Sequence, residues 1–198
     1  MRRIERNPNG KGIFRPGQDL VVAGAIGKAG VKAALSEKET EIQARFPGWF
    51  VERTREAAEK ELKLTPEILD ALGATEWEYV KEGGILAALW NLSGAYERGI
   101  SFDMRKIPME QELVEICELL DLNPYRLLSG ECVLMAADNG GDVVNALAER
   151  GILAAVIGKA ERGIARKMTG LGTTGYLERP QPDEILKITG RNEEETHA

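Results

Sequence analysis

Short apolar runs that favour β-strands alternate with longer segments that favour helices, and glycine stands at many of the junctions. The first run, 19–23, leads into a glycine-rich stretch at 24–30, and similar runs lie at 100–104, 131–137 and 152–158. Strands interleaved with helices pack as a sheet covered by helices. The pattern therefore predicts an α/β (α+β) fold with a mixed sheet.

Helix-favouring sequence fills the spaces between these runs. Segment 31–72 is charged, is interrupted at Pro47-Gly48, and restarts at Thr65, an N-cap residue before a proline at the first helical position. We interpret this segment as a helical insertion. The other predicted elements are helices at 85–97, 112–120 and 141–150, a hairpin of 165–168 with 176–178, and a turn or short helix at 184–188.

One domain accounts for most of the chain. The 198 residues are 43% hydrophobic, which is enough for one core, and no internal repeat is visible. Gly10, Gly12 and Pro16 break the start of the sequence. We expect an extended arm at 1–15, a single domain at 16–190 and a disordered acidic tail at 191–198.

Charge and hydropathy exclude several classes of protein. Lysine plus arginine is 26 and aspartate plus glutamate is 32, a net charge of 26 − 32 = −6, which argues against a general nucleic-acid binder. No apolar run is long enough to span a membrane, and no apolar segment follows the basic start as in a secretory signal. We expect a cytoplasmic protein without nucleic-acid or membrane partners.

The cysteines and the histidine offer no metal or catalytic pattern. Cys117 and Cys132 have no CxxC partner and are interpreted as buried thiols, whereas His197 lies in the tail. No zinc site, Ser-His-Asp triad or Cys-His pair is therefore expected. The candidate carboxylates are too dispersed in the sequence to indicate an acid/base pair or a magnesium cage. They are Glu76, Glu78, Glu82, Asp103, Asp138 and Asp142.

The sequence GAIGKAG at 24–30 invites a phosphate-binding interpretation. A P-loop requires a glycine five residues before Gly27, where Val22 stands, and a hydroxyl after Lys28, where Ala29 stands. The dinucleotide spacing G-x-G-x-x-G is not met either. Two interpretations are left: an anion site at Gly27 and Lys28, or a turn that only allows close packing.

Gly83-Gly84 opens a strongly apolar helix and offers the same geometry. Free N–H groups at a helix start attract anions, and Lys81 adds positive charge, although Glu82 opposes it. A glycine turn that only permits tight packing is the alternative. The aromatic residues nearest this turn are Trp77, Tyr79 and Trp90, and we interpret them as a cluster around it that belongs to the core rather than to a ligand platform.

The ordered set of motifs resembles the C-terminal domain of the aminoimidazole ribonucleotide (AIR) synthase family. The resemblance covers about residues 16–187. It rests on PGQDLVVAG at 16–24, GGILAALWNLS at 83–93, GISFDM at 99–104 with Ile107-Pro108, EICELLDLNP at 115–124, LSGECVLMA at 128–136, RGILAAVIGKA at 150–160 and LERPQPDEILK at 177–187.

The resemblance implies ATP and magnesium chemistry. The family includes AIR synthase, formylglycinamidine ribonucleotide synthase, selenophosphate synthetase, thiamine-phosphate kinase and the hydrogenase-maturation carbamoyl dehydratase. Its members use ATP to activate an oxygen, and an N-terminal domain holds most of the nucleotide and magnesium ligands. This sequence matches the second domain only. It departs at 78–81, where related proteins carry a His-Asp pair and a hydroxyl, and in its tail EEETHA, where the dehydratase carries a cysteine.

The leading functional hypothesis is a non-catalytic or half-enzyme module. It would bind a phosphorylated or nucleotide-like ligand through Lys81, Gly83 and Gly84, with Gly27 and Lys28 second, or complete the site of a separate N-terminal-domain protein. The phrases GGILAAL and EICELLDLNP favour the hydrogenase-maturation branch. On this hypothesis Gly84→Asp abolishes binding while the fold survives.

Two other functions stay open. The first is an ATP-dependent synthase or kinase of the same family, with a magnesium site that the sequence does not reveal. The second is a structural module that forms a homo-oligomer through the aromatic side chains around Trp77 and Trp90.

Overall fold

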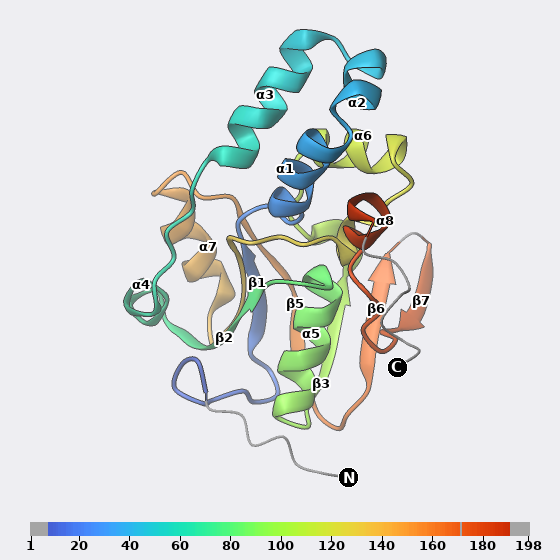
Figure 1. Cartoon of the computed structure of the whole chain (residues 1–198). Coiled ribbons are helices and arrows are strands. Elements are labelled where there is room, and N and C mark those ends of the chain that lie inside the picture. The colour runs from blue at the N-terminus through green and yellow to red at the C-terminus, as the bar shows by residue number, and fades with distance from the viewer. Residues whose placement is uncertain (1–7, 171, 191–198) are drawn as a thin grey trace, which may run out of the picture.

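The computed structural model describes residues 8–170 and 172–190, and within them the chain forms one seven-stranded mixed sheet (Figure 1). The strand order is β2-β4-β1-β5-β3-β6-β7. Neighbouring strands are antiparallel except for β3 and β6, which are parallel. The strands are β1 (Asp19–Ala23), β2 (Ala74–Val80), β3 (Gly99–Asp103), β4 (Cys132–Ala137), β5 (Ala154–Glu161), β6 (Arg166–Gly170) and β7 (Thr173–Tyr176). The predicted mixed sheet is confirmed.

Helices cover both faces of this sheet. Helix α5 lies on one face and α7 on the other, and α2 and α3 form the end of the molecule farthest from the arm (Figure 1). The helices are α1 (Lys28–Glu37), α2 (Glu39–Arg45), α3 (Gly48–Glu59), α4 (Pro66–Ala71), α5 (Gly84–Ala95), α6 (Gln111–Leu119), α7 (Gly140–Ala148) and α8 (Leu186–Thr189), with 3₁₀ turns at Met104–Lys106 and Pro124–Arg126. None of the described helices is both long and apolar enough to cross a membrane.

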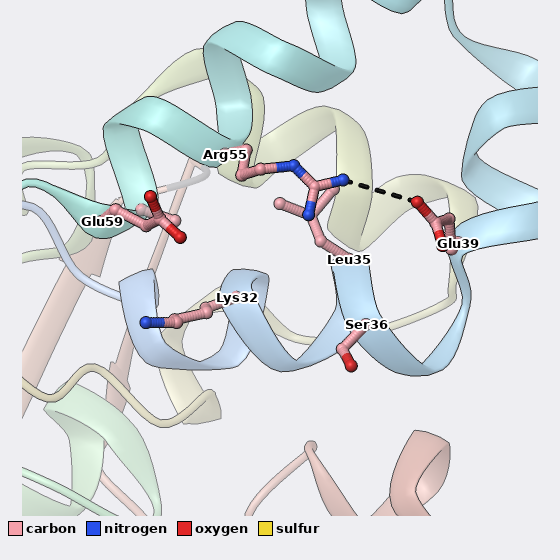
Figure 2. Close-up of a pocket in the computed structure, with 7 residues that line it drawn as sticks. Lys32, Leu35, Ser36, Glu39, Arg55 and Glu59 are labelled. Carbon is pink, nitrogen blue, oxygen red and sulfur yellow. Dashed lines mark hydrogen bonds and ion pairs between the residues drawn. The ribbon is translucent and has the colours of Figure 1, made fainter.

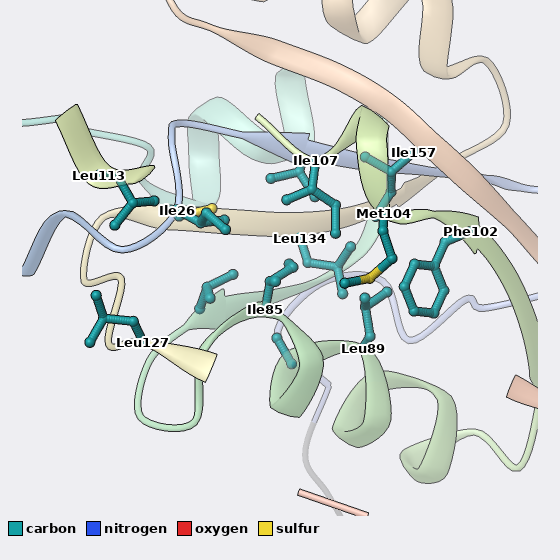
Figure 3. Packing of buried hydrophobic residues seen from close by; sticks show 14 of the residues in the cluster. Ile26, Ile85, Leu89, Phe102, Met104, Ile107, Leu113, Leu127, Leu134 and Ile157 are labelled. Carbon is teal, nitrogen blue, oxygen red and sulfur yellow. The ribbon is translucent and has the colours of Figure 1, made fainter. Parts of the chain in front are cut away.

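The central strand β1 shows why the apolar runs are continuous. Successive side chains of a strand point to opposite faces of the sheet. Leu20 and Val22 pack in the larger core cluster with α5, whereas Val21 and Ala23 pack in a second cluster with α7. Both faces are therefore buried, so a run without polar alternation folds as a strand. Figure 3 shows the packing of the larger cluster.

Strand β2 was not predicted from the sequence. Its residues read Ala-Thr-Glu-Trp-Glu-Tyr-Val, and Glu76 interrupts the apolar pattern. In the structure Glu76 is only 2% exposed, because it accepts hydrogen bonds from the N–H groups of Asn9 and Gly10 and from the Tyr96 hydroxyl. The described part of the N-terminal arm thus satisfies a carboxylate that the sequence alone presents as a surface residue.

The aromatic residues near the Gly83-Gly84 turn pack in the core, as the sequence predicts, but they do not form one cluster around the turn. Trp77 belongs to the second core cluster, and Trp90 packs against the larger cluster on the other face of the sheet. The side chain of Trp77 points to the face of β2 opposite the one that α5 covers, so the two rings lie on different sides of the sheet although they are close in sequence. The tail at 191–198, including His197, and residues 1–7 of the arm lie outside the described residues.

Both cysteines are expected to resist alkylation in the folded protein. Burial raises the pKa of Cys117 and of Cys132 to about 12, so the reactive thiolate is about 10⁻⁴ of each thiol at pH 8. Iodoacetamide labelling followed by mass spectrometry should show no adduct in native buffer and two adducts in guanidinium. Rapid labelling of either cysteine in native buffer would contradict the burial described here.

Candidate functional site

The start of α5 is built around two glycines in left-handed backbone conformations. Gly83 has φ 77° and Gly84 has φ 66°, backbone angles that residues with a side chain rarely adopt. A Cβ on Gly84 would lie 2.5 Å from the Tyr125 carbonyl oxygen. Glycine therefore lets the 3₁₀ turn at 124–126 approach the first residue of α5, which places Arg126 beside the helix start.

An internal carboxylate already occupies one amide of this helix start. The N–H of Gly83 donates to Oδ2 of Asp183 at 2.7 Å, and Oδ1 of Asp183 accepts from the N–H groups of Leu128 (3.1 Å) and Ile185 (2.9 Å). Asp183 is 2% exposed. Three N–H donors and the positive end of α5 stabilise this buried charge. The chain itself thus supplies an anion at the turn where the sequence predicts an external one.

A cavity of about 170 Å³ opens beside the same turn. Its lining includes Gly83, Ala87 of α5, Arg126, Met168 of β6 and segment 177–181. Two arginines, Arg126 and Arg179, are therefore among its lining residues. Nη2 of Arg126 lies 3.8 Å from the exposed carboxylate of Glu178, a distance and an exposure at which an ion pair is weak. Both arginines are available to an anionic ligand.

Of the three ligand residues predicted at this turn, only Gly83 borders the cavity. Gly83 is the N-cap of α5, and Gly84 is the first residue of that helix. Lys81 is exposed and does not border the cavity. Sequence reasoning missed Arg126 and Arg179 because each is a single arginine in a loop, far in sequence from Gly83. A role of Lys81, Gly83 and Gly84 in ligand binding stays a prediction.

The second predicted turn uses its amides internally. The N–H of Gly27 donates to Ser129 Oγ at 2.9 Å, and the N–H of Gly30 donates to the Leu128 carbonyl at 2.8 Å. A Cβ on Gly27 would lie 2.5 Å from Leu113 Cδ1, and Lys28 Nζ lies 3.8 Å from a carboxylate oxygen of Glu110. This geometry favours a packing turn. Ligand binding at Gly27 and Lys28 stays a prediction without an open amide to support it.

One loop joins the two glycine turns. Leu128 accepts from Gly30 through its carbonyl and donates to Asp183 through its N–H. Gly27 and Gly83, which precede α1 and α5, have almost the same backbone conformation, φ 77° with ψ 3° and φ 77° with ψ 2°. The turns that the sequence presents as separate sites are thus connected through loop 127–130.

Another cavity, of about 300 Å³, lies between α1, α2 and α3 (Figure 2). Its charged groups are of both signs: Lys32 and Arg55 face Glu59 and Glu39, and Arg55 lies 3.5 Å from Glu39. Because opposite charges balance here, this cavity is a poorer receptor for a phosphate than the one at α5.

The dispersed carboxylates form no magnesium site in the part of the chain that the structure describes. No group of three or more His, Cys, Asp or Glu side chains converges there. The Arg15 guanidinium and the Gln18 amide lower the pKa of Asp138, and Arg105 lowers the pKa of Asp103. These two carboxylates therefore serve ion pairs within the chain.

The comparisons with known proteins identify the fold. No family model matches the chain. It is similar to the carbamoyl dehydratase HypE of Rhizobium leguminosarum bv. viciae, with 29% identity over 136 residues that cover 66% of this chain and 36% of that protein. Among solved structures, it is similar to HypE of E. coli, with a TM-score of 0.66 and 20% identity over 90% of this chain and 55% of that one.

Two further structures extend the similarity. HypE in complex with ATP has a TM-score of 0.60 and 15% identity over 90% of this chain and 54% of that one. Thiamine-monophosphate kinase of Stenotrophomonas maltophilia K279a has a TM-score of 0.55 and 20% identity over 87% of this chain and 55% of that one. The chain has the AIR synthase-related fold. It spans about a third of the curated relative and about half of each solved protein.

Proposed function

We propose that this domain binds the phosphate of a phosphorylated or nucleotide-like ligand in the cavity at the start of α5. The observation that carries the proposal is that two arginines, Arg126 and Arg179, line a cavity that Gly83 also borders. Arginine presents a planar fork of donors that matches phosphate oxygens. The amides of Gly83 and Gly84 already donate to Asp183 and to the Lys81 carbonyl, so the proposal rests on the two arginines and not on the helix start.

The size of the cavity limits what it holds. Pockets for complete small-molecule ligands are commonly about 300–1,000 Å³. At about 170 Å³ this cavity accommodates a phosphate but not a whole nucleotide. The rest of the ligand therefore extends outside it, and we propose that a second domain or a partner protein covers that part. The solved HypE in complex with ATP supports a nucleotide-like ligand. A solved HypE–HypF complex, with a TM-score of 0.60 and 18% identity over 84% of this chain and 54% of that one, supports a partner protein.

The hydrogenase-maturation branch is the proposed setting, since the curated relative is a carbamoyl dehydratase. An ATP-dependent reaction would need a magnesium site contributed from outside the described residues, because these contain no converging carboxylates. The structural-module alternative placed its interface at Trp77 and Trp90, but Trp77 is buried in the second core cluster and Trp90 packs against the larger one. A homo-oligomer and a cytoplasmic location stay predictions.

Replacement of Arg179 by glutamine is expected to weaken phosphate binding about tenfold, because one charge-assisted contact is lost. Isothermal titration calorimetry with inorganic phosphate, ADP and ATP with magnesium measures the effect. Arg98→Gln is the matched control: it removes the same charge from an exposed arginine that lies outside the cavity. Equal weakening by both variants, or no binding to the unaltered protein, would contradict the proposal.

A further inference from the structure

The face of α5 that borders the cavity continues beyond it. Gly83, Ala87, Trp90 and Gly94 follow one another at spacings of three or four residues, so they lie on one side of the helix. Gly83 and Ala87 border the cavity. Trp90 and Gly94 therefore extend the same side by about two turns.

Strand β6 continues along the same path. Met168 borders the cavity, and Arg166 is two residues away on the same strand, so both side chains point to the face that α5 covers. Arg166 Cζ lies 3.9 Å from the centroid of the Trp90 ring. The stacked pair of Arg166 and Trp90 is thus the next feature along α5 after the cavity.

The Arg166 guanidinium has no acidic partner within residues 8–170 and 172–190. Its Nε is buried and makes no hydrogen bond among the described residues, and none of the ion pairs found there includes it. Desolvation lowers its pKa. Burying part of a charged group without an acceptor is unfavourable. The stacking on Trp90 offsets some of this cost but satisfies none of the N–H donors.

Arg166 is partly exposed, and Gly94 of α5 lies beside its guanidinium. Gly94 is exposed, and a Cβ at this position would lie 3.4 Å from Arg166 Nη2. The absence of a side chain at Gly94 leaves that edge of the guanidinium uncovered. A planar, unpaired cation held in a fixed orientation is suited to a carboxylate or a phosphate.

We propose that Arg166 is a second anion-binding group of the same ligand site. This inference rests on the proposed function: the phosphate lies at Arg126 and Arg179, and a second acidic group of the ligand contacts Arg166. The seven residues from Gly83 to Trp90 correspond to about 10 Å along α5. The ligand is therefore an elongated molecule with an anionic group at each end, rather than a simple phosphate monoester.

Calorimetry with three probes tests the inference. Inorganic phosphate occupies the cavity alone, whereas 8-phosphonooctanoate and octane-1,8-diphosphonate carry a second acid far enough away to contact Arg166. We expect at least one long probe to bind about tenfold tighter than phosphate. The tighter of the two distinguishes a carboxylate from a phosphate as the second group.

Arg166→Gln should remove this advantage and leave phosphate affinity unchanged. Lys167→Gln, the adjacent exposed position on the other face of β6, should retain it. Arg166→Lys keeps the charge, and thermal melting of each variant verifies folding. Long probes that bind no tighter than phosphate, or an advantage that persists in Arg166→Gln, would overturn the inference. The proposed function survives that result if Arg179→Gln still weakens phosphate binding, whereas both fail if phosphate does not bind at all.

Discussion

Gly84→Ala is expected to destabilise the fold by about 2–5 kcal/mol. An alanine at φ 66° costs about 1–2 kcal/mol, and overpacking adds about 1–3 kcal/mol, since its Cβ would lie 2.5 Å from the Tyr125 carbonyl oxygen. The backbone of the 124–126 turn cannot yield as a flexible side chain would. For a chain of this length the melting temperature should fall by about 5–15 °C in differential scanning calorimetry.

Gly151→Ala separates the two causes. Gly151 has nearly the same φ, 68°, but nothing lies within 4 Å of a Cβ at that position. Its replacement should therefore cost only the backbone strain, about 1–2 kcal/mol. Equal losses in the two variants would contradict the close approach of Tyr125 to α5. The same geometry corrects the use of Gly84→Asp as a binding test: that substitution reports on folding, because the larger side chain meets the same backbone.

The sequence predicts correctly the elements whose local sequence is enough to indicate their surroundings. Strand β1 spans the predicted 19–23, because both of its faces are buried and an apolar run needs no polar alternation. The helix after Gly83 was predicted from a local signal, its glycine start. The hairpin was predicted at 165–168 and 176–178, whereas its strands run to Gly170 and from Thr173, into the predicted glycine-rich turn. Strand β2 was missed because Glu76 is satisfied by the distant arm, which local sequence does not reveal.

The candidate site likewise has one part that the sequence predicts and one part that only the fold reveals. The Gly83 turn is visible in the sequence, because a glycine before an apolar helix is a local signal of a positive φ. Its chemical partners are not. Asp183 lies 100 residues from Gly83 in sequence and 55 from Leu128, and only the fold brings them together. The two arginines follow the same rule, since Arg126 and Arg179 meet through the return of the C-terminal segment to α5.

Asp183→Ala is expected to cost about 3–5 kcal/mol. The substitution leaves the buried N–H groups of Gly83, Leu128 and Ile185 without an acceptor, and each unpaired group costs about 1–3 kcal/mol before relaxation. It also removes the negative charge at the positive end of α5. Urea unfolding should show the loss. Because the carboxylate joins α5, loop 127–130 and the segment after Pro182, the amides of all three should exchange faster with deuterium.

Two variants distinguish the hydrogen bonds of Asp183 from its charge. Asp183→Asn retains an oxygen for Leu128 and Ile185 but turns an NH₂ donor toward the N–H of Gly83, so its loss should be intermediate. Glu82→Gln removes an exposed charge beside the same turn and should stay within about 0.5 kcal/mol. Added acetate should restore part of the stability of Asp183→Ala, because it supplies the missing carboxylate. If Asp183→Ala were as stable as Glu82→Gln, the start of α5 would not depend on an internal anion, and the amide of Gly83 would be open to an external one.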